Sequence, residues 1–249
     1  VAGYPWFGRW GRDTFISLPG LCIALNDWRM FRLCIDTMLE DFKDGFFPNI
    51  GEGQSAAYNS VDAPLWFFWA VQQYAYINDA RKEVWQLYGS VMRNILENFS
   101  DGTSNVRMDS NYLLWQGEEG KALTWMDAVI EGVPVTQRKG YAVEINALWY
   151  NAVMFYVELA KLHCNDGEIA KWAEFVENFP ANFKQTFWSK EIGYLADYVD
   201  GAYKDFSVRC NMIFAAGLTY SPVSPKIRQL IVEKVKQELM NYDLVPEEW

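Results

Sequence analysis

The chain of 249 residues is poor in the side chains that build metal centres and nucleophilic triads. It contains a single histidine, His163, and its four cysteines, Cys22, Cys34, Cys164 and Cys210, show no C-x-x-C spacing. With a single histidine and no closely spaced cysteine pair, neither a zinc site nor Ser-His-Asp catalysis is expected. The cysteines stand mostly in apolar periodic segments, which predicts buried free thiols. We therefore expect no metal and no organic cofactor, and any catalysis must use carboxylates.

Long apolar runs and dense basic runs are also missing. No stretch approaches the ~18 uninterrupted apolar residues of a membrane helix, and the first residues lack the charged-then-apolar form of a signal peptide. The net charge of −10 and the scattered Lys and Arg residues argue against nucleic acid. The expectation is a soluble, cytoplasmic protein that contacts neither a membrane nor nucleic acid, with a neutral substrate.

Aromatic residues are abundant instead. They make up 17% of the chain, and hydrophobic residues 51%, which is ample for the core of one large domain. Residues 112–128, YLLWQGEEGKALTWMDA, combine Trp115 and Trp125 with the carboxylates Glu118, Glu119 and Asp127. Carboxylates beside indole faces suit a sugar, which offers hydroxyls and an apolar C–H face. The alternative is an ordinary long loop anchored by a tryptophan pair.

Helical periodicity alternates between segments that are apolar nearly all round and segments that are amphipathic. The predicted inner helices cover residues 14–25, 61–77, 142–162 and 207–218, and the predicted outer helices cover 27–42, 79–99, 166–183 and 225–240. Residues 188–206 predict a hairpin or an irregular excursion. Long loops precede the inner helices, which predicts an all-α toroid of inner and outer helices in a single domain, 1–249. A helical solenoid is the alternative, but its repeats would be similar in length.

Five segments in order carry a resemblance to a known family: AGYPWFGRWGRDTF, YNSVDAPLWF, GEEGKALTWMDA, VEINALWYNA and VRCNMIFA. They resemble the amylo-α-1,6-glucosidase domain of glycogen debranching enzymes. The resemblance implies an (α/α)6 barrel, of which this chain would hold about eight of twelve helices. It also implies hydrolysis, with inversion, of the α-1,6-linked glucose left at a trimmed branch of glycogen. An attached N-terminal domain in the parent protein is left open.

The resemblance makes Asp127 the proton donor. Trp125 and Met126 beside it would remove water from the carboxyl, as suits a general acid. Inversion needs a second carboxylate ~6.5–9.5 Å away to activate water, and the resemblance puts this base downstream of Met240. The expectation is weak or no glucose release from residues 1–249 alone. The alternative for Asp127 is the cap of a helix beginning at Ala128.

The other motif residues are expected to form a pocket for one terminal glucose. Arg12 and Asp13 would hydrogen-bond the sugar, although Asp13 also stands where a helix N-cap would. Interhelical hydrogen bonding is the alternative for Glu144 and Asn146. The family's usual Arg-Pro-Asn is Arg-Cys-Asn here. The full set of predicted binding residues is Trp6, Trp10, Arg12, Asp13, Asp62, Trp66, Trp115, Glu118, Trp125, Glu144, Asn146, Arg209 and Asn211.

Two rival functions fit the same features. One is a glucan-binding or interaction module that keeps the aromatic cleft without turnover. The other is a hydrolase of the same barrel type with another linkage preference, such as a glucoamylase-like or trehalase-like enzyme. Release of glucose from a branched limit dextrin separates the first rival from an enzyme, and a panel of substrates separates the second.

Overall fold

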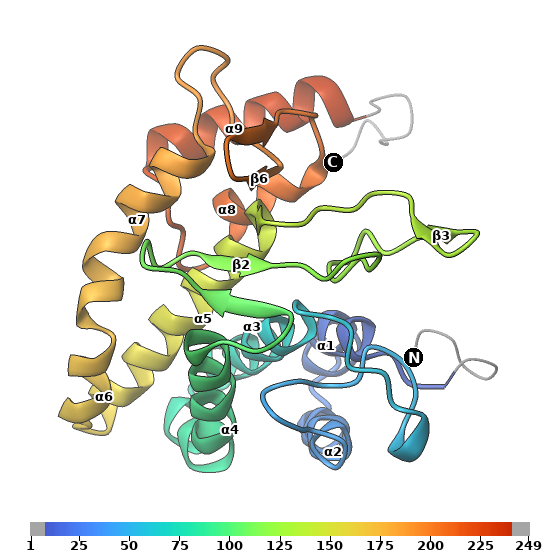
Figure 1. The fold of residues 1–249 in the computed structure, drawn as a ribbon. Coiled ribbons are helices and arrows are strands. Elements are labelled where there is room, and N and C mark those ends of the chain that lie inside the picture. The colour runs from blue at the N-terminus through green and yellow to red at the C-terminus, as the bar shows by residue number, and fades with distance from the viewer. Residues whose placement is uncertain (1–7, 241–249) are drawn as a thin grey trace, which may run out of the picture.

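A row of inner helices organises the computed structural model, which describes residues 8–240 (Figure 1). The inner helices pack on one another in chain order: α1 (Gly11–Leu18), α3 (Ala63–Ile77), α5 (Val143–Leu162) and α8 (Ile213–Gly217). The outer helices cover this row: α2 (Trp28–Leu39), α4 (Arg81–Asp101), α6 (Asp166–Lys171), α7 (Ala173–Phe187) and α9 (Pro225–Leu239). The alternation of inner and outer helices expected from periodicity is therefore present.

Burial explains the two kinds of helix. On α3 the side chains of Leu65, Phe67 and Phe68 face different directions and are all buried, because neighbouring elements enclose the helix. Outer helix α7 instead buries one stripe, in which phenylalanines recur every fourth residue from Phe175 to Phe187. That spacing places them on one helix face. The amphipathic pattern thus turns each outer helix toward the inner row.

Local signals fix several helix ends. The Asp27 carboxylate accepts a hydrogen bond from the Met30 N–H at 2.9 Å and caps α2, as predicted for a helix beginning there. Gly102, with φ of 94°, ends α4 in a conformation that glycine adopts without strain. A π-helical turn, η1 (Pro19–Ile23), continues α1. A 3-10 turn, η2 (Gly53–Ser55), lies in the loop before α3.

Three predicted helices differ from the structure. The helix expected over 14–25 begins already at Gly11, and its last part is the π-helical turn that ends at Ile23. Residues 166–183 were expected to form one helix, but the chain breaks at Trp172, whose ring is buried edge-on against Trp149 at 5.7 Å. The helix expected over 207–218 is reduced to a 3-10 turn, η3 (Cys210–Met212), followed by α8. Residues 207–209 are not helical: Arg209 is extended, and the Ser207 N–H donates to the Asp205 carboxylate at 2.7 Å.

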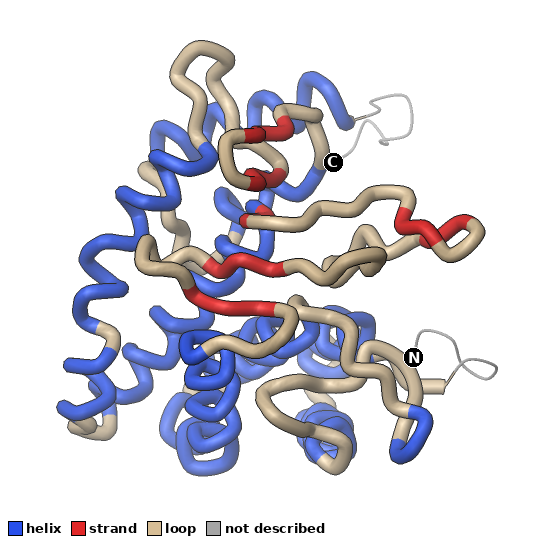
Figure 2. The backbone as a smooth tube through the Cα atoms, in the orientation of Figure 1, coloured by secondary structure: helices blue, strands red, loops and turns tan. Residues whose placement is uncertain are grey.

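The expectation of an all-α fold is wrong in detail, because three small antiparallel sheets occupy the long loops (Figure 2). Their strands are β1 (Val106–Met108) with β2 (Leu114–Gln116), β3 (Val129–Ile130) with β4 (Val133–Pro134), and β5 (Tyr141–Ala142) with β6 (Tyr198–Asp200) and β7 (Tyr203–Asp205). The antiparallel pair β6 and β7 confirms the hairpin predicted within 188–206. Strand pairing satisfies backbone groups that a buried loop would leave unpaired.

The inner helices form a row in the described residues and do not close into the twelve-helix ring implied by the resemblance. Apolar side chains of the first inner helix and of the turns that follow it are exposed at Ile16, Leu21 and Leu25. Within residues 8–240, none of the helices combines the length and apolar character that crossing a bilayer requires.

Candidate active site

The N-terminal ends of the four inner helices lie on the same side of the row, close to one another. Arg12 is the second residue of α1, Asp62 directly precedes α3, Glu144 is the second residue of α5, and Asn211 lies in η3 just before α8. Four segments that are far apart in sequence therefore contribute polar side chains to one place. The partial positive charge of helix N-termini also favours the carboxylates of Asp62 and Glu144 there.

A cavity of about 260 Å³ lies at this place. Its polar lining includes Arg12, Asp62 and Glu144, and its apolar walls are Ile16, Trp66, Trp125, Cys210 and Phe214. Trp66 packs edge-on against Phe214 with ring centroids 5.3 Å apart, which fixes one aromatic wall. The predicted residues Arg12, Asp62, Trp66, Trp125 and Glu144 are thus brought together, although they come from four parts of the chain.

Arg12 connects the first inner helix to two carboxylates. Its Nε lies 2.5 Å from Asp62 Oδ2 and its Nη2 lies 3.0 Å from Asp62 Oδ1, a bidentate pair in a buried position. Its Nη1 reaches Asp127 Oδ2 at 3.2 Å, and Ser60 Oγ also contacts the pair. Burial alone would lower the pKa of Arg12, but the charges of Asp62 and Asp127 outweigh burial and raise it.

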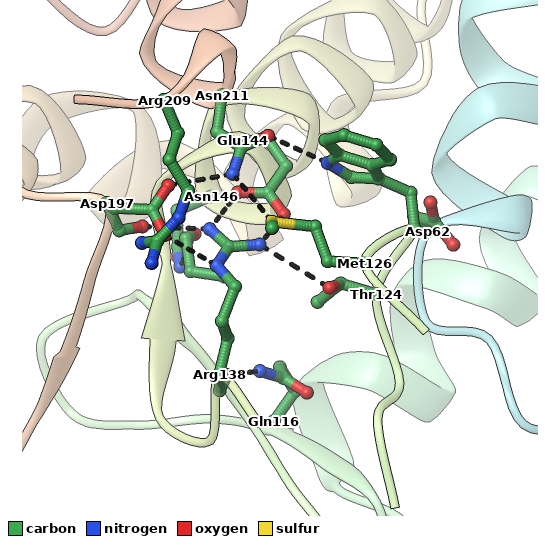
Figure 3. A network of polar contacts seen from close by, with 12 residues as sticks. Asp62, Gln116, Thr124, Met126, Arg138, Glu144, Asn146, Asp197, Arg209 and Asn211 are labelled. Atoms are coloured by element: carbon green, nitrogen blue, oxygen red, sulfur yellow. Dashed lines mark hydrogen bonds and ion pairs between the residues drawn. The ribbon is translucent and has the colours of Figure 1, made fainter. Parts of the chain in front are cut away.

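A second buried guanidinium, that of Arg138, ties Glu144 and Asp197 together (Figure 3). Both Glu144 oxygens accept from Arg138, with Nη2 to Oε2 at 2.7 Å, and Arg138 Nε donates to Asp197 Oδ2 at 2.7 Å. Burial raises the pKa of Glu144, and the ion pair with Arg138 acts against that rise. Thr124 Oγ1, 3.4 Å from Arg138 Nη1, joins the network.

Asp127 is the least enclosed carboxyl beside the cavity. Its side chain is 35% exposed, and its hydrogen bond in the described part of the chain is the one with Arg12. The alternative reading of Asp127 as a helix cap is wrong, because Ala128 leads into strand β3. Trp125, which was expected to exclude water from this carboxyl, is itself 41% exposed.

Several predicted residues lie away from the cavity lining. Asp13 sits in the first turn of α1 and is not its N-cap, which is Trp10. Trp115 stands on β2 with the Arg107 guanidinium 4.0 Å from its ring centroid, so a cation covers one of its faces. Glu118 pairs with Lys121 across a turn.

The remaining predictions concern supporting positions. Asn146 uses its amide on the backbone of strand β2, accepting from Leu114 N at 2.8 Å and donating to Leu114 O at 3.1 Å. Arg209 binds Asp197 at 2.7 Å and Asp205 at 2.9 Å, behind the cavity. Trp6 falls outside the described residues.

The sequence did not predict three apolar residues of the cavity wall, Ile16, Cys210 and Phe214. It also did not predict three polar residues of the site, Ser60, Arg138 and Asp197. Ser60 stood inside the quoted segment YNSVDAPLWF, two residues before Asp62, and could have been included on that ground. Arg138 and Asp197 lie outside every quoted segment, and their pairing spans 59 residues of sequence. No local pattern marked either of them.

The prediction of buried thiols is correct for Cys22 alone. Cys34 is half-buried, and Cys164 and Cys210 are exposed, Cys210 on the cavity wall. Cys164 follows the end of an apolar stretch, and Cys210 precedes one. At such positions periodicity does not determine which way a side chain faces. Within residues 8–240, no cluster of three or more His, Cys, Asp or Glu side chains is arranged to hold a metal ion.

Comparisons with solved structures show the fold. A rhamnosidase from Klebsiella oxytoca with rhamnose bound superposes with a TM-score of 0.61 at 11% identity, over 93% of this chain and 42% of that one. A GH78 family rhamnosidase of Bacillus sp. GL1 gives a TM-score of 0.53 at 11% identity, over 94% of this chain and 26% of that one. The helical architecture is therefore shared with these two proteins.

Sequence comparison agrees with the resemblance carried by the five segments. The chain is 25% identical over 260 aligned positions to the glycogen debranching enzyme of Saccharomyces cerevisiae. The match covers 77% of this chain, and the chain spans 17% of the length of that relative. The family model described as amylo-alpha-1,6-glucosidase matches residues 1–242. Because that match covers nearly the whole sequence, the chain belongs to the amylo-α-1,6-glucosidase family.

Proposed function

We propose that this chain forms the sugar-binding and proton-donating part of a glycoside hydrolase that releases glucose from α-1,6 branch stubs of glycogen-like glucans. Family membership supports the reaction class, and the cavity at the helix N-termini supplies the site. Asp127 is the proton donor in this proposal, and Arg12, Asp62, Trp66, Trp125 and Glu144 hold the terminal sugar.

The pairing of the carboxyls at the cavity carries the proposal. Asp62 and Glu144 each accept two hydrogen bonds from one buried guanidinium, so both are held in an ion pair. Asp127 accepts a single, longer hydrogen bond of 3.2 Å and stays partly exposed. A general acid must reach the leaving oxygen of the substrate, and Asp127 is the carboxyl whose atoms remain accessible for that contact.

The size of the cavity favours a single sugar ring. Its volume of about 260 Å³ lies just below the ~300–1,000 Å³ typical of sites for larger ligands. Indole and phenyl walls suit the C–H face of a pyranose, and the guanidinium and carboxylates suit its hydroxyls. A terminal glucose of a branch stub fits these requirements, while the rest of the glucan would lie outside.

The chemistry follows from this placement. Protonated Asp127 donates its proton to the glycosidic oxygen as the bond to the anomeric carbon breaks, and a water activated by a second carboxylate attacks from the opposite face. The carboxylate left on Asp127 faces Arg12 Nη1 at 3.2 Å, which stabilises the new negative charge. Asp62 and Glu144 are poorly suited to activate the water while both are bound to guanidinium groups.

Release of free glucose from a limit dextrin with α-1,6-linked glucosyl stubs tests the proposal in the full-length protein. We expect Asp127→Asn to retain glucan binding and to lower turnover by ~10²-fold or more, the usual scale for a lost general acid. Asp101→Asn, an exposed substitution at the end of α4, is the matched control and should leave turnover unchanged.

Two results would contradict the proposal. Turnover of Asp127→Asn near that of the unaltered protein would remove Asp127 from the acid role. Binding of branched glucan with no glucose release would favour the glucan-binding module, and preferred release from α-1,4-linked or α,α-1,1-linked substrates would favour the glucoamylase-like or trehalase-like enzyme.

A further inference from the structure

The exposed indole of Trp125 is tethered by a buried amide. Trp125 Nε1 donates to Asn211 Oδ1 at 2.7 Å, across 86 residues of sequence. Asn211 is fully buried, whereas Trp125 lies at the cavity rim. The amide also contacts the side chain next to the indole, because Asn211 Nδ2 lies 3.5 Å from Met126 Sδ. One buried side chain therefore holds two consecutive residues that lead directly to Asp127.

The orientation of this amide follows from its partners. An indole N–H can only donate, and a carboxylate can only accept. Asn211 must therefore turn its oxygen to Trp125 and its NH2 group to Asp197, whose Oδ1 lies 2.7 Å from Nδ2. A flipped amide would lose both hydrogen bonds. The tether thus has one stable arrangement.

Asp197 makes the far end of the tether rigid. Its Oδ2 accepts from Arg138 Nε and Arg209 Nη1, both at 2.7 Å, and its carbonyl accepts from Arg138 Nη2 at 3.0 Å. Its own N–H donates to Asp205 O at 2.7 Å. Figure 3 shows Arg138, Arg209 and Asn211 around Asp197. These hydrogen bonds hold the Asp197 carboxylate in place. The tether through Asn211 therefore restrains the Trp125 indole.

We propose that Asn211 is a positioning residue that fixes the plane of the Trp125 indole, so that this ring is ready to stack on the sugar before the sugar arrives. The inference rests on the proposed function for the use of the ring, and on the geometry for the tether. An exposed tryptophan on a loop would otherwise sample several rotamers, and binding would have to order it. The Asp197–Asn211 pair removes that cost in advance.

Hydrogen exchange of the indole N–H tests the tether without any reaction. In protein labelled with ¹⁵N-tryptophan, the Trp125 signal is identified by its loss in Trp125→Phe. We expect Asn211→Leu to speed exchange of this N–H about tenfold or more, because the donor loses its buried acceptor. Asn151→Leu is the control: it removes another buried amide, bonded to Gln72 at 2.9 Å, and should leave the Trp125 signal unchanged.

Glucose titration tests the consequence for the site. We expect Asn211→Leu and Trp125→Phe each to weaken glucose binding by up to about tenfold, the scale of ordering one side chain on binding. In the Trp125→Phe background, Asn211→Leu should add little further loss, because both changes remove the same contact.

Unchanged exchange of the Trp125 N–H in folded Asn211→Leu would overturn the inference, and so would glucose affinity of Trp125→Phe equal to that of the unaltered protein. If the unaltered protein fails to bind glucose, the proposed function is what fails, and the exchange experiment still decides whether Asn211 holds the indole.

Discussion

At the scale of single residues, Arg12 shows how the site depends on charge pairing. Its guanidinium is buried and lies between Asp62 and Asp127, so the two carboxylates compensate a charge that would be costly to bury alone. A lysine could not reproduce the bidentate contact to Asp62, because its ammonium is a single point charge. Arg12 therefore combines its proposed role in sugar binding with a contribution to the stability of the fold.

Replacing Arg12 by methionine tests this link. We expect Arg12→Met to lower the free energy of unfolding by about 3–5 kcal/mol, because the buried Asp62 carboxylate loses its partner. Urea unfolding measures the change. Arg32→Met removes an exposed ion pair with Glu83 and should cost no more than about 1 kcal/mol. An equal loss of unfolding free energy in the two variants would show that the buried ion pair stabilises the fold no more than the exposed one.

Cys210 offers a chemical probe of the cavity wall. Loss of water around its thiol raises the pKa above its ordinary value of 9.0, and the thiolate is the reactive form. Alkylation in a Cys164→Ser background should therefore keep accelerating with pH above about 9, where an ordinary thiol levels off. Glucose should slow the reaction because the thiol lines the cavity. Labelling at Cys210 that levels off near pH 8, or that glucose does not slow, would contradict this prediction.

At the scale of elements, the start of α1 depends on a close backbone approach. A Cβ at Gly11 would overlap the carbonyl oxygen of Pro48, while the Gly11 N–H donates to Asn49 O at 3.0 Å. The loop before α3 therefore packs directly on the first turn of α1. Because Arg12 is the next residue, this contact also fixes the backbone position from which the Arg12 side chain extends.

The substitution Gly11→Ala should accordingly displace α1. We expect the free energy of unfolding to fall by about 1–3 kcal/mol through overpacking, and glucose binding to weaken as Arg12 moves. Thermal or urea unfolding and a glucose titration check the two effects. Gly20→Ala, in η1 with no atom within 4 Å of the new Cβ, should be neutral or stabilising by up to about 1 kcal/mol. A Gly11→Ala variant as stable as Gly20→Ala would refute the close approach.

At the scale of the whole molecule, one ion network joins the β6–β7 hairpin to the inner helices. Asp205 ends β7 and binds Arg209, which also binds Asp197 in the core. Burial alone would raise the pKa of Asp205, but hydrogen bonds from Ser207 and Arg209 outweigh burial and hold it below its ordinary value of 3.8.

Acid should therefore weaken the fold through this network. A carboxyl with a lowered folded-state pKa contributes stability above about pH 4, and this contribution disappears as pH falls through the folded-state value. We expect the free energy of unfolding to drop more steeply between about pH 4 and pH 2 in the unaltered protein than in Asp205→Asn. Unfolding curves across this range give both slopes, and equal slopes would remove Asp205 from the acid response.

The sequence by itself determined most of the helices and most of the cavity lining. Continuous apolar periodicity places α3 and α5 within a residue or two of their predicted ranges, because a helix enclosed on all sides must be apolar on all sides. The motifs also identified Arg12, Asp62 and Glu144, since each stands at the N-terminal end of an inner helix. The position of a residue at the start of a helix depends on nearby sequence, so a local pattern can predict it.

Only the tertiary structure decided which charges pair. Arg138 meets Asp197 across 59 residues and Asn211 meets Trp125 across 86, and no local pattern specifies a partner at that separation. The same long-range packing gives Asp127 a weaker contact with a guanidinium than Asp62 and Glu144 have, although the sequence shows all three only as carboxylic side chains. The residue types are written in the chain, but the pairing of a guanidinium with a carboxylate depends on distances that exist only after the inner helices have packed.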